Sequence, residues 1–493
     1  MTRVPGPPQG VDSQLGFTMT SEWTVDPQNP RNWSFRRKAV STTVVSGIGF
    51  ISTLAASIYA PSYEAVSRQF AISETLALLP LSFYNLGMAF GPVISSPLSE
   101  TLGRKAVYLT TTPIFAIFVL GSGFSQNIAA LTICRFFAGV FASAGVSLAA
   151  ATIADIATPV DRAIPLAMYY ATPFVGSLLG PLMGGFIVEN KGWRWTQWTV
   201  LLFVAVFFPP VLFIRETYRK IILKRRMIRF NLEEPCQYQH SLGHDVHYFL
   251  TKTVARPIHM LFTEPIVSFV CLYTGFQFAL LYTFVVASPH VFLTVYGFSP
   301  GAQGLSFIGF IVACLLSPIP MILMDRYVYR RKFQVFKEEA TQTNAVAVAV
   351  SDSQEEFPPE HRLYCAMIGS VILPVGLFWF SWAANPSVHW ICAIVAQAVT
   401  MLGSLLIYVS ASLYMVDTYG PLYGASATGA SSLSRYTLSA GFPLFALQMF
   451  TRLGVGWASR LLAFCTLAMA PIPWIFYRWG PNLRARSKYQ REN

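Results

Sequence analysis

Long apolar stretches separated by short polar ones occupy most of this chain. A helix that crosses the hydrocarbon core of a bilayer needs about 20 mostly apolar residues, and twelve stretches reach that length. We predict membrane helices over residues 38–60, 74–98, 106–125, 128–153, 163–188, 196–214, 265–288, 301–324, 363–383, 388–415, 424–450 and 456–477. The pattern therefore predicts an all-α membrane protein with twelve transmembrane helices.

The predicted helices form two groups of six, joined by a long polar segment. We expect a tail over residues 1–37, a first bundle over 38–215, a central loop over 216–264, a second bundle over 265–477 and a second tail over 478–493. Two six-helix halves with a site between them at the bilayer midplane are typical of secondary transporters. We therefore expect two pseudo-symmetric six-helix bundles.

Basic residues gather in alternate segments of the chain. They are concentrated in the two tails, in the central loop and in the loops after the second and eighth predicted helices. These segments share one side of the membrane if the chain crosses it twelve times. Because short loops rich in Lys and Arg stay on the cytoplasmic side, we expect both termini in the cytoplasm. We expect the plasma membrane as the location.

Composition argues against several other classes of protein. The chain is 54% hydrophobic and 12% charged, with a mean hydropathy of +0.48, whereas a soluble domain carries about 25% charged residues. The net charge of +12 comes from the basic loops, so we expect a lipid bilayer as partner and no nucleic acid. The seven cysteines are irregularly spaced, and no P-loop or metal motif is present. We expect no metal, no cofactor and no ATP-driven pump.

A short polar turn follows the second predicted helix. Gly103 suits a tight turn because it has no Cβ, Glu100 lies at the membrane edge, where a charge needs a partner, and Arg104 and Lys105 are basic. Taken alone, the stretch could be an ordinary basic turn. It resembles the loop motif of the major facilitator superfamily, with Ser96 in place of the usual Gly and Glu100 in place of Asp.

In that family this loop contacts the opposite half and gates the inner side of the protein. The resemblance therefore implies a gating role for Glu100, Gly103, Arg104 and Lys105. The second half has a looser version of the same order, an acid followed by bases. It begins with Asp325 and Arg326, to which we extend the gating role.

Arg135 lies within the fourth predicted helix. A central arginine costs roughly 2.5–3.5 kcal/mol on insertion scales, so its side chain should face a cavity or a partner. The alternative is a side chain that reaches the interface. The stretch resembles the superfamily's motif for this helix, although Ala138 replaces the usual Gln. In the family this arginine is linked to proton coupling.

The fifth predicted helix carries a regular glycine pattern. Gly176, Gly180 and Gly184 recur every four residues, and such small faces allow close helix approach in lipid. Pro181 should kink the helix, and Gly185 follows the last of the three. Ordinary close packing is one explanation. The stretch also resembles the superfamily's antiporter motif at each defined position, and that motif is characteristic of exporters.

Polar residues inside the predicted helices are the expected lining of a cargo pathway. The candidates are Asn85, Arg135, Gln277, Tyr282, Gln397, Tyr408, Arg435 and Gln448. Hydrogen bonding between helices is the alternative role for the amides, and helix packing is the alternative for Arg435. Acidic residues are scarce at membrane depth. The two arginines therefore favour a neutral or carboxylate-bearing cargo over a multivalent cation.

Further stretches, among them residues 26–34, 192–198 and 215–218, resemble the fungal twelve-span drug:proton antiporter family. The resemblance covers residues 26 to 489 and includes multidrug, polyamine-like and secondary-metabolite efflux transporters. It implies proton-coupled efflux of a small organic molecule by alternating access, with protons as the coupling ion. The cargo would be a drug, a toxin or an endogenous secondary metabolite, and the sequence leaves that choice open.

Other functions remain as alternatives. A proton-coupled importer of a nutrient would share the fold, but the glycine motif disfavours it. A membrane receptor would need a larger soluble domain. A membrane enzyme would need a catalytic or metal cluster, and the clustered histidines are His240, His244 and His247. We therefore expect a transporter, not an enzyme, that acts as a monomer.

Overall fold

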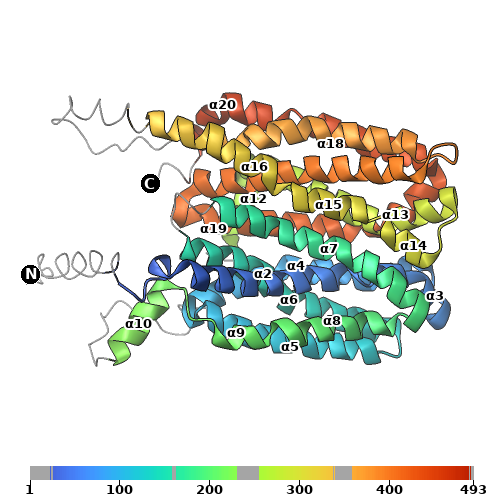
Figure 1. Cartoon of the computed structure of the whole chain (residues 1–493), viewed down its shortest axis with the longest axis horizontal. Coiled ribbons are helices and arrows are strands. Elements are labelled where there is room, and N and C mark those ends of the chain that lie inside the picture. Colours follow the sequence, from blue (N-terminus) through green and yellow to red (C-terminus); the bar gives the residue numbers. More distant parts are fainter. Residues whose placement is uncertain are drawn as a thin grey trace, which may run out of the picture.

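The computed structural model describes residues 23, 26–157, 163–229, 255–336, 338, 358–487 and 489. The described part is almost entirely helical and contains no β-strand. Its long helices run side by side along one common direction (Figure 1). The predicted all-α fold is therefore confirmed.

The first half crosses the bundle six times. Its elements are α2 (Phe35–Ser57), α3 (Tyr63–Phe70), α4 (Glu74–Leu102), α5 (Arg104–Phe124), α6 (Ile128–Ile156), α7 (Ala163–Lys191), α8 (Arg194–Phe207) and α9 (Pro209–Phe213). Helices α8 and α9 together make one crossing of 20 residues. The short helix α3 was not predicted from the sequence, and it follows α2 after the 3-10 turn η2 (Ala60–Ser62).

The second half also crosses six times. Its elements are α13 (Pro265–Tyr296), α14 (Pro300–Leu305), α15 (Ile308–Leu316), α16 (Pro318–Met324), η5 (Asp325–Tyr329), η6 (Pro359–Leu363), α18 (Tyr364–Ala383), α19 (Trp390–Met469) and α20 (Ile472–Arg486). Between the halves lie α10 (Arg219–Arg229) and α12 (Arg256–Thr263). These two helices occupy part of the predicted central loop, whose three clustered histidines lie outside the described residues.

Two glycines divide α19 into three membrane crossings. Gly420 has a φ of 58° and Gly454 a φ of 74°, values that favour glycine because it lacks a Cβ. The described chain contains eleven apolar segments long enough to span a membrane, and the last of them, Ser426–Ala485, has 60 residues. That length corresponds to roughly 90 Å of helix, about three times the hydrocarbon thickness. Because Gly454 interrupts it, this segment supplies two crossings, which brings the total to the twelve predicted.

Polar caps set several helix ends at the predicted breaks. The Asn127 side chain accepts the N–H of Ala130 at 2.7 Å and starts α6, directly after the polar residues 125–127 that separate it from α5. Ser73 caps α4 in the same way through the N–H of Leu76. A side-chain oxygen at this position satisfies an N–H that has no partner within the helix. Local sequence therefore fixes where these crossings begin.

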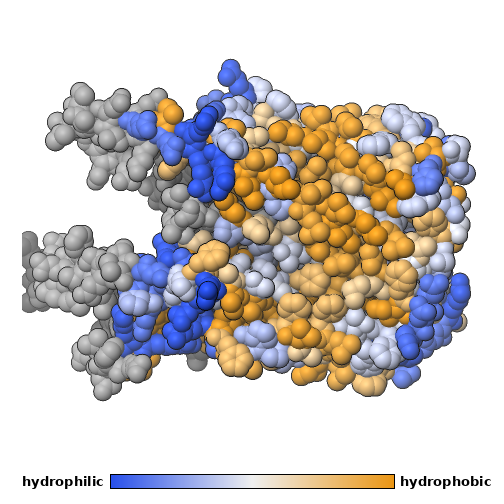
Figure 2. Space-filling model, in the orientation of Figure 1, coloured by the Kyte–Doolittle hydropathy of each residue, from blue (hydrophilic) through white to orange (hydrophobic). Residues whose placement is uncertain are grey.

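The molecule has an apolar middle and two polar ends. We call the end where α2 begins and α20 ends the terminal end, and the end that carries α3 and α14 the distal end (Figure 1). Hydrophobic side chains cover the middle of the visible face, and hydrophilic ones gather toward both ends (Figure 2). Leu202, Val206 and Leu315 are 62%, 67% and 63% exposed. Such exposure of large apolar side chains fits contact with lipid.

Candidate functional site

A cavity of about 340 Å³ lies between the two halves. Its walls come from α4, the first residue of α5, α6 and α7 of the first half and from α13 and α19 of the second. Residues that line it include Glu100, Arg104, Ser143, Ser147, Tyr169, Tyr170, Phe174, Phe278, Tyr408, Thr428, Ser432, Arg435 and Tyr436. The cavity extends to Glu100 and Arg104, which lie beside the terminal end of α4. Its size suits a small organic molecule.

Contacts between the halves close the distal end. The carboxylate of Glu189 in α7 accepts the N–H of Gly301 in α14 at 2.8 Å. The amide of Gln448 in α19 donates to the hydroxyl of Thr75 in α4 at 3.2 Å. The backbones also approach closely there, since a Cβ on Gly185 would lie 2.8 Å from the carbonyl oxygen of Pro300. The structure therefore has a cavity that reaches the terminal end and a seal at the distal end.

Arg435 lies in the cavity wall within a ring of aromatic side chains. Its guanidinium donates to the Tyr408 hydroxyl, to Ser432 Oγ at 2.9 Å and to the Ser431 carbonyl oxygen at 3.2 Å. It also lies 4.8 Å from the ring centroid of Phe278. The structure thus brings together two of the predicted cavity residues, Arg435 and Tyr408.

Arg135 is fully buried in α6 and connects three helices of the first half. Its guanidinium donates to the carbonyl oxygens of Ala55 at 2.8 Å and Ala56 at 3.0 Å, and to that of Pro80 at 3.5 Å. Because α2 ends at Ser57, the carbonyls of Ala55 and Ala56 belong to its last turn, where intrahelical donors are missing. The arginine therefore stabilises the break in the first crossing. It does not line the cavity.

The loop between α4 and α5 is held by a carboxylate from a distant segment. Glu216 accepts the backbone N–H of Arg104 at 2.9 Å and that of Lys105 at 3.2 Å. Gly103 has a φ of 98°, and a side chain there would collide with Glu216. Glu216 stands in the predicted 215–218 stretch, but this contact was not predicted, because no local pattern pairs residues 112 positions apart.

The gating residues of this loop contact the first half and the segment that directly follows it. The Arg104 guanidinium donates to Ser99 and to the Asp155 carboxylate at 3.4 Å, and it lies over the Tyr218 ring. The Lys105 ammonium donates to the Leu212 carbonyl oxygen. Glu100 is exposed. Among the described residues, the hydrogen bonds and ion pairs of this loop do not reach the opposite half, and that contact stays a prediction.

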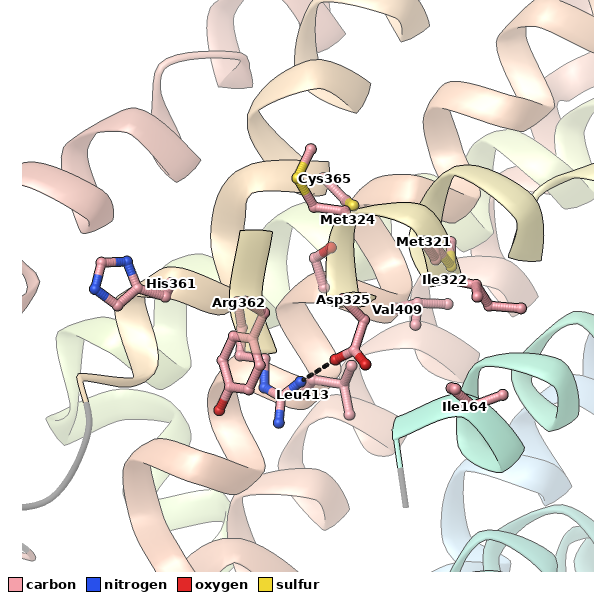
Figure 3. A pocket seen from close by; sticks show the side chains of 12 residues that line it. Ile164, Met321, Ile322, Met324, Asp325, His361, Arg362, Cys365, Val409 and Leu413 are labelled. Carbon is pink, nitrogen blue, oxygen red and sulfur yellow. Dashed lines mark hydrogen bonds and ion pairs between the residues drawn. The ribbon is translucent and has the colours of Figure 1, made fainter. Parts of the chain in front are cut away.

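A comparable charge cluster lies at the terminal end of the second half (Figure 3). Asp325 pairs with Arg330 at 2.9 Å and with Arg362 at 3.3 Å, and Arg362 also pairs with Asp417 at 2.9 Å. Arg326, to which we also extend the gating role, is exposed and takes no part in these ion pairs. The reason is that η5 is a π-helix over Asp325–Tyr329, and Arg330, five residues on, donates to the acid.

The glycines of the predicted antiporter motif face two different neighbours. A Cβ on Gly176 would lie 2.6 Å from the Phe50 carbonyl oxygen of α2. A Cβ on Gly180 would lie 2.7 Å from the nitrogen of Ile58, which directly follows α2, and one on Gly184 would lie 2.6 Å from the Ile58 carbonyl oxygen. Gly185 faces α14 of the other half. The motif therefore packs α7 tightly on the first crossing, and its last glycine lies in the distal seal. Pro181 lies inside the same helix.

The remaining cavity candidates do not line the cavity in this conformation. Gln277 accepts a hydrogen bond from Ser404 at 2.6 Å, and Gln397 donates to Ser288 at 2.8 Å, so both join helices. Gln448 belongs to the distal seal. Asn85 and Tyr282 are buried, in α4 and α13. Sequence reasoning missed the aromatic wall, although Tyr170 and Phe174 are spaced by one helical turn.

No group of three or more His, Cys, Asp or Glu side chains in the described part of the chain is placed to hold a metal ion. The chemistry of the site is instead that of binding. Its deep part offers the Arg435 guanidinium, several hydroxyls and a set of aromatic faces, all between two helix bundles. Two such bundles around a cavity that is closed at one end define a secondary transporter.

The sequence supports this class directly. The model of the Major Facilitator Superfamily matches residues 45–443, most of the chain. The chain belongs to the major facilitator superfamily. A xylose:proton symporter of known structure superposes with a TM-score of 0.63 at 15% identity, over 90% of this chain and 97% of the symporter. At that identity the likeness supports the fold alone.

Three fungal relatives share about a third of their residues with this chain. "Polyamine transporter 4" of Saccharomyces cerevisiae is 35% identical over 94% of this chain and 72% of its own length. "Ascochitine biosynthesis cluster MFS transporter" of Didymella fabae is 35% identical over 94% and 87%. "Efflux pump FUBT" of Fusarium oxysporum is 35% identical over 90% and 72%. The chain is thus a membrane transporter whose relatives include efflux pumps and secondary-metabolite cluster transporters.

Proposed function

We propose that this transporter exports small organic molecules from the cytoplasm in exchange for protons, as a monomer in the plasma membrane. The cavity would alternate between access from the terminal end, toward which it extends as far as Glu100 and Arg104, and access from the distal end. Export requires that the terminal end face the cytoplasm. Proton binding and cargo binding would favour opposite states of the two halves, which is the requirement for coupled exchange.

The distribution of charge supports this orientation. The helix α10 alone carries Arg219, Lys220, Lys224, Arg225 and Arg226, and it lies at the terminal end (Figure 1). Arg104 and Lys105 lie at the same end. Short segments rich in Lys and Arg remain in the cytoplasm, so both termini are expected on that side.

The observation that carries the export proposal is the placement of α7. The helix holds the complete exporter-type glycine motif, packs through it on α2, contributes Gly185 to the distal seal, and lines the cavity with Tyr170 and Phe174. A cargo that contacts these two rings touches the same rigid element that closes the distal end. Cargo binding can therefore bias the seal, as alternating access requires.

The test is uptake by inside-out vesicles that carry the purified protein. Their outer face is the cytoplasmic face, so an exporter should load them from outside when the lumen is acidic. A panel of anionic, neutral and cationic organic compounds is offered, with an uncoupler as the control for the proton gradient. Gradient-dependent accumulation supports export. Transport that appears only in right-side-out vesicles would establish the importer.

A further inference from the structure

Arg435 lies deep in the membrane part of the protein. It stands 15 residues after the break at Gly420 and 19 residues before the break at Gly454 in α19. At about 1.5 Å of rise per residue, both ends of this crossing are more than roughly 20 Å away along the helix. The side chain is 7% exposed, and it lines the cavity.

Within the described part of the chain, the hydrogen-bond partners of Arg435 are all uncharged. The Tyr408 hydroxyl, Ser432 Oγ and the Ser431 carbonyl oxygen take three of its N–H groups, and a guanidinium has five. Two N–H groups therefore remain for a ligand. Holding a positive charge in the interior without a carboxylate partner is costly. A bound anion would therefore stabilise the Arg435 guanidinium.

The charges around the cavity point to the same ligand. Of the described residues that line it, Glu100 is the only acidic one, and it lies two residues before α4 ends at the terminal end. Arg104 is also there. The deep part of the cavity thus holds Arg435 and no carboxylate among its described lining residues. The Arg435 guanidinium would repel an ammonium cargo, whereas it would pair with a carboxylate.

Aromatic side chains from both halves surround this guanidinium. Phe174 of α7 lies 5.0 Å from Phe278 and 5.2 Å from Tyr408, between ring centroids, and Tyr170 lies 5.6 Å from Tyr408. Arg435 itself lies 4.8 Å and 4.9 Å from the centroids of Phe278 and Tyr408. Such faces stack favourably on planar, conjugated molecules. The wall is therefore complementary to a flat apolar body next to an anionic group.

We propose that the cargo is a small aromatic or conjugated carboxylate, and that Arg435 binds its carboxylate while the rings of Tyr170, Phe174 and Phe278 hold its body. This inference rests on the proposed export function, because it assigns the cargo of the same cavity. A guanidinium with two free N–H groups matches the two oxygens of a carboxylate. One relative is named a polyamine transporter, and polyamines are cations. Binding of a cationic cargo in this cavity would therefore contradict the assignment.

The first experiment measures equilibrium binding to the purified protein in nanodiscs, which does not depend on transport direction. The probes are benzoate, 1-naphthoate and anthracene-9-carboxylate at pH 7, each paired with its neutral carboxamide, and 1-naphthylmethylamine as the cation. We expect at least one carboxylate to bind about tenfold or more tightly than its carboxamide, with weaker binding of the amine. Tighter binding of the amine, or no preference for any carboxylate, would overturn the proposal.

Variants of Arg435 then test whether this residue causes the preference for the carboxylate over the carboxamide. Arg435→Gln should abolish the carboxylate preference while the carboxamide binds as before, and Arg435→Lys should retain part of it. The matched control is Arg460→Gln. Arg460 lies in α19 like Arg435 and donates to Ser381 of α18, but it is not among the residues that line the cavity. Retained binding of the carboxamide reports that a variant is folded. An unchanged preference in Arg435→Gln would contradict the assignment.

The same probes in inside-out vesicles separate this inference from the export function. Uptake of other compounds without carboxylate binding would leave export standing and reject the cargo class. Carboxylate binding with transport only in the opposite direction would keep the cargo class and reject export. A weak acid that crosses the bilayer passively in its neutral form does not accumulate in an acidic lumen. Accumulation of 1-naphthoate there therefore reports transport by the protein alone.

Discussion

Two buried charged residues, one in the first half and one just after it, act on backbone groups instead of on ions of opposite sign. Arg135 binds carbonyl oxygens of α2 and α4, and Glu216 binds N–H groups at the start of α5. Both therefore satisfy helix ends that have no partner of their own. This contrasts with Arg435, which lines the cavity.

Replacing Arg135 with Ala should destabilise the first half. The carbonyls of Ala55 and Ala56 would stay buried without a donor, which costs about 1–3 kcal/mol for such groups. We expect a lower melting temperature for Arg135→Ala in detergent and slower transport. Arg460→Ala is the control, because Arg460 is only partly buried. An unchanged melting temperature would show that the carbonyls find other donors.

Replacing Glu216 with Gln should loosen the loop that starts α5. The carboxylate accepts backbone N–H groups from Arg104, Lys105, Thr217 and Tyr218, and hydrogen bonds to charged groups are worth about 1.5–3 kcal/mol. Glutamine keeps one acceptor oxygen, so we expect faster amide hydrogen exchange at residues 104 and 105. Exchange at wild-type rates would contradict this role.

At the scale of elements, the apolar pattern predicted the helices well and their contacts poorly. The break at residues 125–127 follows from Asn127, and the break at 454 follows from Gly454 between two apolar runs. The pairing of Glu216 with residues 104 and 105, and of Arg362 with Asp417, depends on how bundles fold together. Local sequence carries no information on such distant partners. Tyr408 and Arg435 were predictable because buried polar residues are rare in membrane helices.

Close packing of α7 on α2 should not tolerate a side chain at Gly180. A Cβ there would lie 2.7 Å from the Ile58 nitrogen, so Gly180→Val must push the helices apart. We expect a large fall in melting temperature and loss of transport. Gly441→Ala is the matched control, since no atom lies within 4 Å of its Cβ position. Equal stability of the two variants would refute the packing argument.

At the scale of the whole molecule, the two halves meet at the distal end and enclose a cavity that reaches the terminal end. Alternating access requires this arrangement to reverse. The seal consists of a few polar contacts and close backbone approaches, such as Glu189 with Gly301 and Gly185 with Pro300. A seal of this kind can open without unfolding either bundle.

Gly185→Val should open the distal end by separating α7 from α14. Spin labels at Arg68 and Ser387, both exposed, on a background without native cysteines would report the distance between the halves. We expect a longer distance in Gly185→Val than in wild type, and no change in Gly441→Ala. An identical distance distribution would mean that Gly185 plays no part in the seal.

Proton movement driven by cargo alone tests the central claim most directly. Purified protein is reconstituted into liposomes that contain a pH-sensitive dye, with no initial pH gradient, and the tightest-binding carboxylate is added outside. Antiport predicts that cargo entry drives protons out and makes the lumen more alkaline, whereas passive entry of the protonated acid would make it more acidic. A protein-dependent acidification would identify a symporter, and no protein-dependent change would show uncoupled transport. Either result would contradict proton-coupled export.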